Sequence, residues 1–173
     1  MSAPRRSDGE GTAEIAIVRR FDAPRARVFE NWVDAESLGA WFAPEGFTVT
    51  SCAIDARPGG RWQVAYRSPE GLVFTESGEI CELDPPARLV LTLTQVDGEG
   101  RSGPRTVVTV TFEERGAQTE MGFRQTGFEP GPRRDGNAEG WLSCFRRLDA
   151  QLESEREFRA RVRGTAKSDL VPR

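Results

Sequence analysis

Histidine is absent from this sequence of 173 residues. Its absence excludes Ser-His-Asp and Cys-His nucleophile arrangements and every zinc site that contains histidine. It also removes the side chain that most often serves as a general base near neutral pH. Glutamate, aspartate, tyrosine and arginine remain available for catalysis, but no nucleophile–base pair is recognisable, so the sequence favours binding over turnover.

Long apolar runs are absent too, because no stretch reaches the roughly 18 apolar residues of a membrane-spanning helix. Residues 1–8 lack the apolar core of a secretory signal. The three cysteines, Cys52, Cys81 and Cys144, are widely spaced and odd in number, so we predict free thiols in a cytoplasmic protein. Each cysteine is interpreted as a small buried hydrophobe.

Neither sign of charge dominates, since 24 basic and 27 acidic side chains leave a net charge of −3. This balance argues against nucleic-acid binding, which uses clustered lysine and arginine. The arginines between Arg156 and Arg163 are interspersed with glutamates, which is typical of a solvated helix face. The pair Gly59-Gly60 lacks the strand-loop-helix context of a phosphate-binding loop, and no cofactor or metal is predicted.

The length fits one globular domain. We expect this domain at residues 13–160, between a flexible arm at 1–12 and a flexible tail at 161–173. Leu170-Val171-Pro172-Arg173 resembles a thrombin cleavage site, so residues 164–173 are interpreted as a remnant of an expression tag.

Strands are predicted wherever apolar residues alternate with polar ones. These segments lie near residues 15–21, 47–55, 61–67, 73–83, 89–94, 107–112 and 121–125. A bulge is expected at Gly78. Two short helices are expected after the first strand, one with Pro24 at its first position and one capped by Asp34.

A change of period marks the last element. Apolar residues recur there at every third or fourth position: Trp141, Cys144, Phe145, Leu148 and Leu152. This spacing predicts a helix over roughly 137–160, capped by Asp135 or Asn137. Short turns between strands favour antiparallel pairing, and the long helix is expected to cover the apolar face of the sheet.

Several segments resemble one known family in their order and spacing. They are Arg20-Phe21-Asp22-Ala23-Pro24, Trp41-Phe42-Ala43-Pro44, the turn at 55–60, the strand residues at 86–91 and 109–112, and Gly140-Trp141. The family is the activator of heat-shock protein 90 ATPase homologue-like group, within the START/SRPBCC (birch-pollen-allergen-like) superfamily. The resemblance covers about residues 13–155. It implies an α+β helix-grip fold, in which a curved antiparallel sheet of about seven strands surrounds a long C-terminal helix, with two short helices after strand 1.

The resemblance also implies that the gap between sheet and helix is a ligand cavity. The leading hypothesis is therefore binding of a small hydrophobic or aromatic ligand there. The predicted ligand-binding residues are Trp62, Tyr66, Phe74, Phe123, Gln125, Trp141 and Phe145. Arg61 and Glu79 are further polar candidates on the concave face, and no catalytic residue is predicted.

Two alternatives remain open from the sequence. One is a cyclase-, aromatase- or hydrolase-like enzyme in the same cavity. The other is a stress-related, co-chaperone-like interaction module, for which Trp41-Phe42 is the candidate exposed patch. The eukaryotic activator has a separate N-terminal chaperone-binding domain for which this chain has no room, so a small apolar ligand ranks above a chaperone as partner. Either a monomer or a homodimer is expected.

Overall fold

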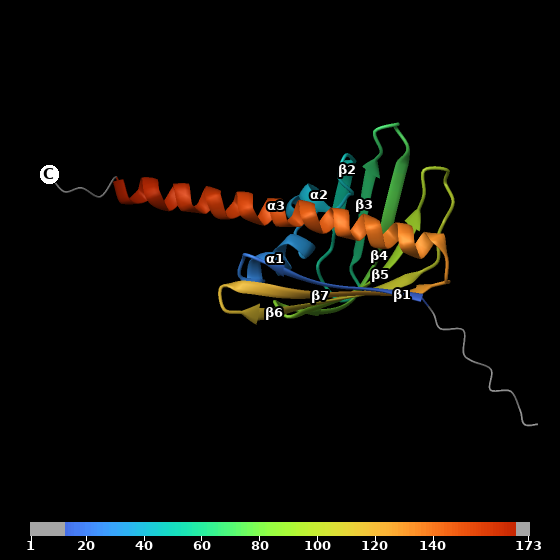
Figure 1. The fold of residues 1–173 in the computed structure, drawn as a ribbon, viewed down its shortest axis with the longest axis horizontal. Coiled ribbons are helices and arrows are strands. Elements are labelled where there is room, and N and C mark those ends of the chain that lie inside the picture. The colour runs from blue at the N-terminus through green and yellow to red at the C-terminus, as the bar shows by residue number, and fades with distance from the viewer. Residues whose placement is uncertain (1–12, 169–173) are drawn as a thin grey trace, which may run out of the picture.

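Seven strands and three helices make up residues 13–168, the part of the chain that this computed structural model describes (Figure 1). The elements are β1 (Ala13–Phe21), α1 (Arg25–Val33), α2 (Ala35–Trp41), β2 (Thr48–Ile54), β3 (Arg61–Arg67), β4 (Val73–Asp84), β5 (Arg88–Val96), β6 (Thr106–Arg115), β7 (Gln118–Phe128) and α3 (Pro132–Ser168). This order confirms the helix-grip architecture expected from the sequence.

All the strands join one antiparallel sheet in the order β1-β7-β6-β5-β4-β3-β2. Strands β2 to β7 form a meander, in which each strand pairs with the next along the chain. Strand β1 lies at the edge of the sheet and pairs with β7. The sheet bends strongly, so that β1, β6 and β7 form a floor and β2, β3 and β4 form an upright wall (Figure 1). Helix α3 crosses the concave side of this bend.

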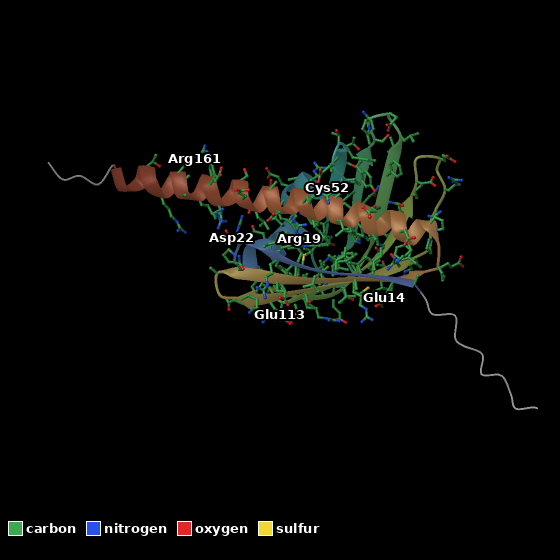
Figure 2. All side chains as sticks on the ribbon, viewed as in Figure 1. Glu14, Arg19, Asp22, Cys52, Glu113 and Arg161 are labelled. Atoms are coloured by element: carbon green, nitrogen blue, oxygen red, sulfur yellow. The ribbon has the colours of Figure 1, made fainter. Side chains whose placement is uncertain are left out.

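The interior follows the predicted alternation. On β3, Trp62, Val64 and Tyr66 are buried, while Arg61 and Arg67 at its two ends are exposed. The predicted apolar stripe of α3 is also buried throughout: Trp141, Cys144, Phe145, Leu148 and Leu152. Side chains from both layers fill most of the space between α3 and the sheet (Figure 2). Apolar periodicity therefore determines which face of each element is inward.

Helix α3 is longer than its apolar stripe predicts. It begins at Pro132, where a proline without a free N–H is tolerated, so Asp135 and Asn137 lie inside the helix rather than capping it. The Asn137 side chain instead donates to the Arg133 carbonyl at 2.9 Å. Residues 161–168 continue the helix where a tail was expected, past the sheet edge in Figures 1 and 2. The predicted arm at 1–12 and residues 169–173 lie outside the described residues.

Two further local predictions need correction, and two are confirmed. Pro24 precedes α1 as its N-cap instead of occupying the first helical position. The bulge in β4 lies between Ile80 and Glu82, not at Gly78. Gly78 is needed because an added Cβ would lie 1.8 Å from the Thr92 carbonyl oxygen. The Asp34 cap is confirmed by its bond from the Ser37 amide at 2.9 Å, and the turn at Gly59 by a φ of 81°.

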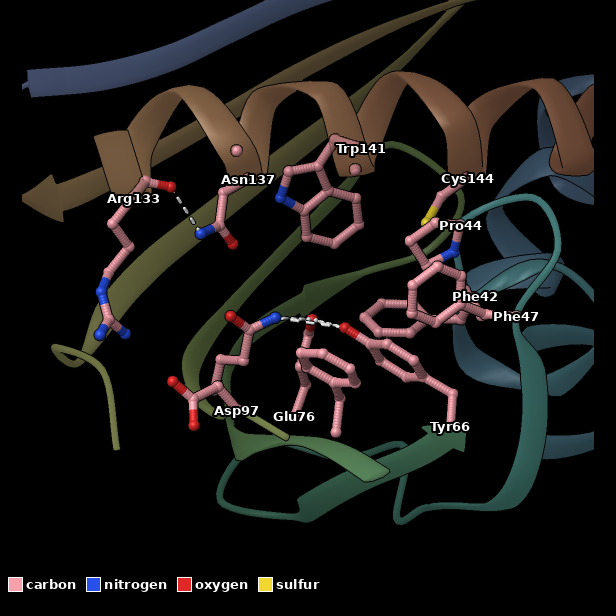
Figure 3. A pocket seen from close by; sticks show the side chains of 15 residues that line it. Phe42, Pro44, Phe47, Tyr66, Glu76, Asp97, Arg133, Asn137, Trp141 and Cys144 are labelled. Carbon is pink, nitrogen blue, oxygen red and sulfur yellow. Dashed lines mark hydrogen bonds between the residues drawn. The ribbon is translucent and has the colours of Figure 1, made fainter. Parts of the chain in front are cut away.

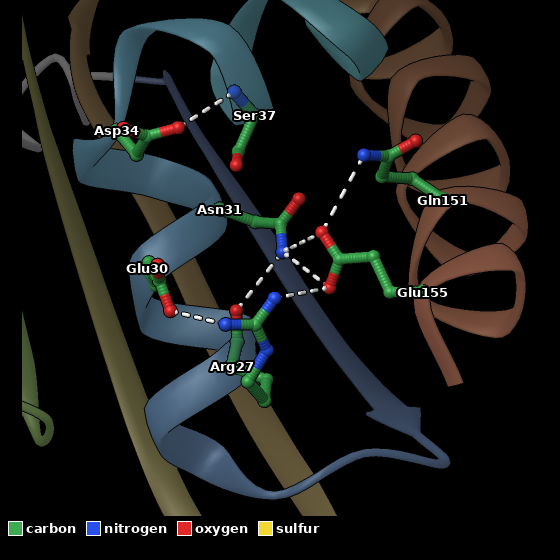
Figure 4. Close-up of polar contacts among 7 residues, drawn as sticks. All are labelled: Arg27, Glu30, Asn31, Asp34, Ser37, Gln151 and Glu155. Carbon is green, nitrogen blue, oxygen red and sulfur yellow. Dashed lines mark hydrogen bonds and ion pairs between the residues drawn. The ribbon is translucent and has the colours of Figure 1, made fainter. Parts of the chain in front are cut away.

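A polar network fixes α3 against α1 (Figure 4). The Arg27 Nη2 donates to Glu155 Oε2 at 2.9 Å, and the Asn31 amide donates to the same carboxylate at 3.3 Å. Gln151 donates to Glu155 from one helical turn away at 3.4 Å. Because Glu155 lies one turn beyond Leu152, this network joins α3 to α1 at the end of the buried stripe.

Candidate ligand-binding cavity

A cavity of about 370 Å³ lies between the first half of α3 and the wall of β3, β4 and β5 (Figure 3). Its lining comes from α3 between Arg133 and Cys144, from the loop after α2 at residues 42–47, and from the inward faces of the three strands. Ligand cavities commonly measure about 300–1,000 Å³, so this space is sufficient for a small organic molecule.

Five of the fifteen residues that line the cavity are aromatic. Tyr66 and Phe74 stack with ring centroids 5.6 Å apart, and Phe47 meets each of them edge-on at 5.9 Å. On the opposite side, Trp141 projects from α3 and contacts Phe42 edge-on at 5.4 Å. Tyr66 and Phe74 are paired residues of neighbouring antiparallel strands, so the strand register itself places their rings together.

The loop at residues 42–47 is held against α3 by hydrogen bonds. The Arg147 Nη1 donates to the Ala43 carbonyl at 2.9 Å, and the Glu45 amide donates to the Ser143 hydroxyl at 2.7 Å. The Arg146 side chain forms an ion pair with Glu45 at 2.5 Å. These contacts fix the side of the cavity that carries Phe42 and Phe47.

One carboxyl group lies in this aromatic wall. Glu76 is buried, and its Oε1 accepts hydrogen bonds from the Tyr66 hydroxyl at 2.7 Å and from the Gln95 amide at 2.9 Å. Burial raises the pKa of Glu76, and the two hydrogen bonds oppose that effect. Burial and the neighbouring Glu76 also raise the pKa of Tyr66, so the phenol stays protonated near neutral pH. Gln95 faces Glu76 because the two residues are register partners.

The family model for Activator of Hsp90 ATPase homolog 1-like proteins matches residues 22–153. The chain belongs to this family. Among solved structures, a Silicibacter pomeroyi protein named AHSA1 is 25% identical with a TM-score of 0.74, and the match covers 83% of this chain and 99% of that one. A Rhizobium leguminosarum protein is 26% identical with a TM-score of 0.73, covering 82% and 95% of the two chains.

A Nitrosomonas europaea protein shares the fold at 24% identity and a TM-score of 0.72, covering 87% of this family member and 99% of the relative. No curated protein matches the chain. Within residues 13–168, no three acidic or cysteine side chains are grouped as metal ligands would be. No helix in this described part combines the length and the apolarity needed to cross a bilayer.

The structure divides the seven predicted binding residues of this family member into two groups. Tyr66, Phe74 and Trp141 line the cavity. The other four lie in the packed interior: Trp62, Phe123, Gln125 and Phe145. Both ends of the Gln125 amide are used within the protein, because Trp141 Nε1 donates to its Oε1 at 2.7 Å and its Nε2 donates to the Thr106 hydroxyl at 2.8 Å. Gln125 thus orients Trp141.

Most of the lining was not predicted from the sequence, including four residues that shape the proposed site: Phe42, Phe47, Glu76 and Gln95. A signal for Glu76 exists, since it alternates with Phe74 and Ile80 on the inward phase of β4 and is the charged residue in that series. Phe42 and Phe47 lie in the loop after α2, where the backbone period does not decide which side chains face the cavity. Gln95 is identifiable only through its pairing with Glu76 across two strands.

Other sequence predictions need correction. Trp41 and Phe42 are 0% and 4% exposed, so they form no surface patch for a protein partner. Trp41 instead packs between α1 and α3 and donates to the Asn31 carbonyl at 2.9 Å. Arg61 and Glu79 are exposed, because they lie on the outward phase of their strands.

The cysteines are all free, as predicted, but they differ in burial. Cys144 is buried beside the cavity and Cys52 is half-buried, whereas Cys81 is exposed at the β4 bulge. The prediction of three buried thiols is therefore wrong for Cys81, because this residue follows the buried Ile80 and lies on the outward phase of β4. Burial raises the pKa of both Cys52 and Cys144, which makes them poor nucleophiles.

Proposed function

We propose that this family member binds a small apolar or aromatic molecule in the cavity between α3 and the β3–β5 wall and releases it chemically unchanged. The observation that carries this proposal is the convergence of five aromatic side chains on an unfilled space. Elsewhere between helix and sheet, the same residue types pack against each other in a continuous core. The absence of histidine adds to the preference for binding over catalysis.

Affinity would come mainly from burial of apolar surface. At about 25 cal/mol per Å², enclosing roughly 200 Å² of ligand surface contributes about 5 kcal/mol before ordering costs. The wall is preformed by the bonds of Arg147 and Ser143 to the loop at 42–47, so little of this free energy is spent on ordering the protein. Dissociation constants from about 0.2 mM into the millimolar range are expected from this contribution.

A fluorescence titration with the neutral naphthalene dye prodan tests the proposal. The dye should bind the native protein at one site, with a blue-shifted emission. Gly140 lies in the cavity lining, and an added Cβ meets no neighbouring atom within 4 Å. Gly140→Leu should therefore place an isobutyl group in the cavity and weaken dye binding by about tenfold or more.

Gly164→Leu is the matched control, because Gly164 lies on the same helix, outside the cavity lining, and also has open space around it. It should leave dye binding unchanged. Equal dye affinity in both variants, or dye binding that appears only after partial unfolding, would contradict the proposed function.

A further inference from the structure

The cavity holds a buried acidic group that no positive side chain among the described residues accompanies. The Glu76 residue is 7% exposed, and within the described residues no arginine forms an ion pair with it. The other charged groups in the lining are Asp97 and Arg133. Asp97 is occupied by the hairpin after β5, where it accepts from the Glu99 and Arg101 amides at 3.0 and 2.9 Å. Arg133 is exposed in the first turn of α3, at the far end of the cavity from Tyr66 (Figure 3).

The two oxygens of the Glu76 carboxyl group differ in their partners. Oε1 accepts both protein hydrogen bonds, from Tyr66 and from Gln95. No donor within residues 13–168 reaches Oε2. In this part of the chain, the fully buried side-chain nitrogen and oxygen atoms that lack a hydrogen-bond partner belong only to residues of α1: Arg27, Asn31 and Trp32. Oε2 is not among them, so it keeps contact with the cavity space.

The surroundings of Oε2 select the kind of group that would occupy it. Burial disfavours the charged form of this carboxyl group, and a cationic donor would offset that cost while it supplies a hydrogen bond to Oε2. Ring faces attract cations as well, and Tyr66, Phe74 and Phe47 form a cluster beside Glu76. A neutral hydroxyl would form a hydrogen bond with Oε2 but would not stabilise the charged form of the carboxyl group.

We propose that the ligand of this cavity is an apolar molecule with one protonated amine, which donates to Oε2 of Glu76 while the apolar body lies between Trp141 and the aromatic wall. This inference rests on the proposed function, because it specifies the chemistry of the same ligand. Tyr66 and Gln95 hold the carboxylate in place, so the free oxygen has a fixed direction before the ligand arrives.

Calorimetric titration of the full chain with 1-naphthylmethylamine and with 1-naphthylmethanol tests the inference. The two probes have the same apolar body and differ in the ammonium or hydroxyl group. The amine should bind the unaltered protein about tenfold more tightly than the alcohol or better. Glu76→Gln keeps the side-chain shape, and it should abolish this preference while the alcohol affinity stays within about threefold.

Glu79→Gln is the matched control, because it removes an identical charge from the exposed face of the same strand. It should change neither affinity, which separates a local effect of Glu76 from general attraction of a cation to an acidic protein. The comparison of the two probes on the unaltered chain does not depend on whether any variant folds.

The outcomes separate the two proposals. If the alcohol binds and the amine binds no better, the amine inference is overturned while apolar ligand binding stands. If Glu76→Gln weakens both probes equally, Glu76 supports the wall rather than the ligand, and the inference is again overturned. If neither probe nor prodan binds, the proposed function fails together with it.

Discussion

Truncation of Phe145 to alanine should be among the most destabilising single changes in this protein. Its side chain is 0% exposed and lies in the middle of the α3 stripe. Ring centroids of Phe123, Trp141, Trp32 and Trp41 lie 5.3 to 6.2 Å away. Removing a fully packed phenylalanine costs about 3–5 kcal/mol, and each favourable ring pair adds about 0.5–1.5 kcal/mol beyond area burial.

We therefore expect Phe145→Ala to lower the free energy of unfolding by about 4–5 kcal/mol. For a chain of this size, such a loss lowers Tm by about 8–20 °C. The measurement is urea-induced unfolding followed by tryptophan fluorescence and by circular dichroism, with the two probes required to coincide.

The control for this prediction is Phe158→Ala, which removes the same atoms from the same helix at a residue that is 68% exposed. It should change the free energy of unfolding by no more than about 0.5 kcal/mol. A loss below about 1 kcal/mol in Phe145→Ala would refute the reasoning, because it would mean that this part of the interior is not closely packed.

Two more predictions follow from thiol and carboxyl burial. Thiol titration of the denatured, unreduced protein should count three free thiols, those of Cys52, Cys81 and Cys144. In the native protein, Cys81 should react first and Cys144 only on unfolding. A count of one thiol would demonstrate a disulfide. For Glu76, the pKa is higher in the folded than in the unfolded state, so the folded state binds its proton more tightly. Stability relative to Glu76→Gln should therefore decline as pH rises above the ordinary glutamate pKa of about 4.3, and urea unfolding at pH 4 and pH 7.5 that shows no such decline would contradict the burial of this group.

The inward faces of the elements are predictable because burial follows the backbone period. Strand β3 alternates Trp62, Val64 and Tyr66 with polar residues, and all three are inward as expected. The inward phase does not separate core residues from cavity residues, however. The Trp62 ring packs against Phe42 with centroids 5.7 Å apart, and its Nε1 donates to the Thr92 carbonyl at 3.0 Å. Tyr66, four residues further along the same strand face, borders the cavity.

The candidate site was predictable only in part for the same reason. Tyr66, Phe74 and Trp141 follow from period and resemblance. The inward phase of β4 indicates Glu76 as well, but its hydrogen bonds to Tyr66 and Gln95 depend on the pairing of β4 with both β3 and β5. Phe47 reaches the cavity because Arg147, far along the chain, holds its loop. No local pattern encodes that contact.

The sequence by itself determined the order of elements, the antiparallel meander, the buried stripe of α3 and the family, because each depends on local periodicity or on motif order. The tertiary structure alone decided that α3 stays apart from the β3–β5 wall and that four of the seven predicted ligand residues pack in the core. It also decided that no donor within residues 13–168 reaches the second oxygen of Glu76. The physical reason is that a cavity forms only where the side chains of two layers do not fill the distance between their backbones. Its existence depends on how far the loop at 42–47 and the Glu155 network hold the helix from the sheet, and those contacts join residues about 100 or more positions apart.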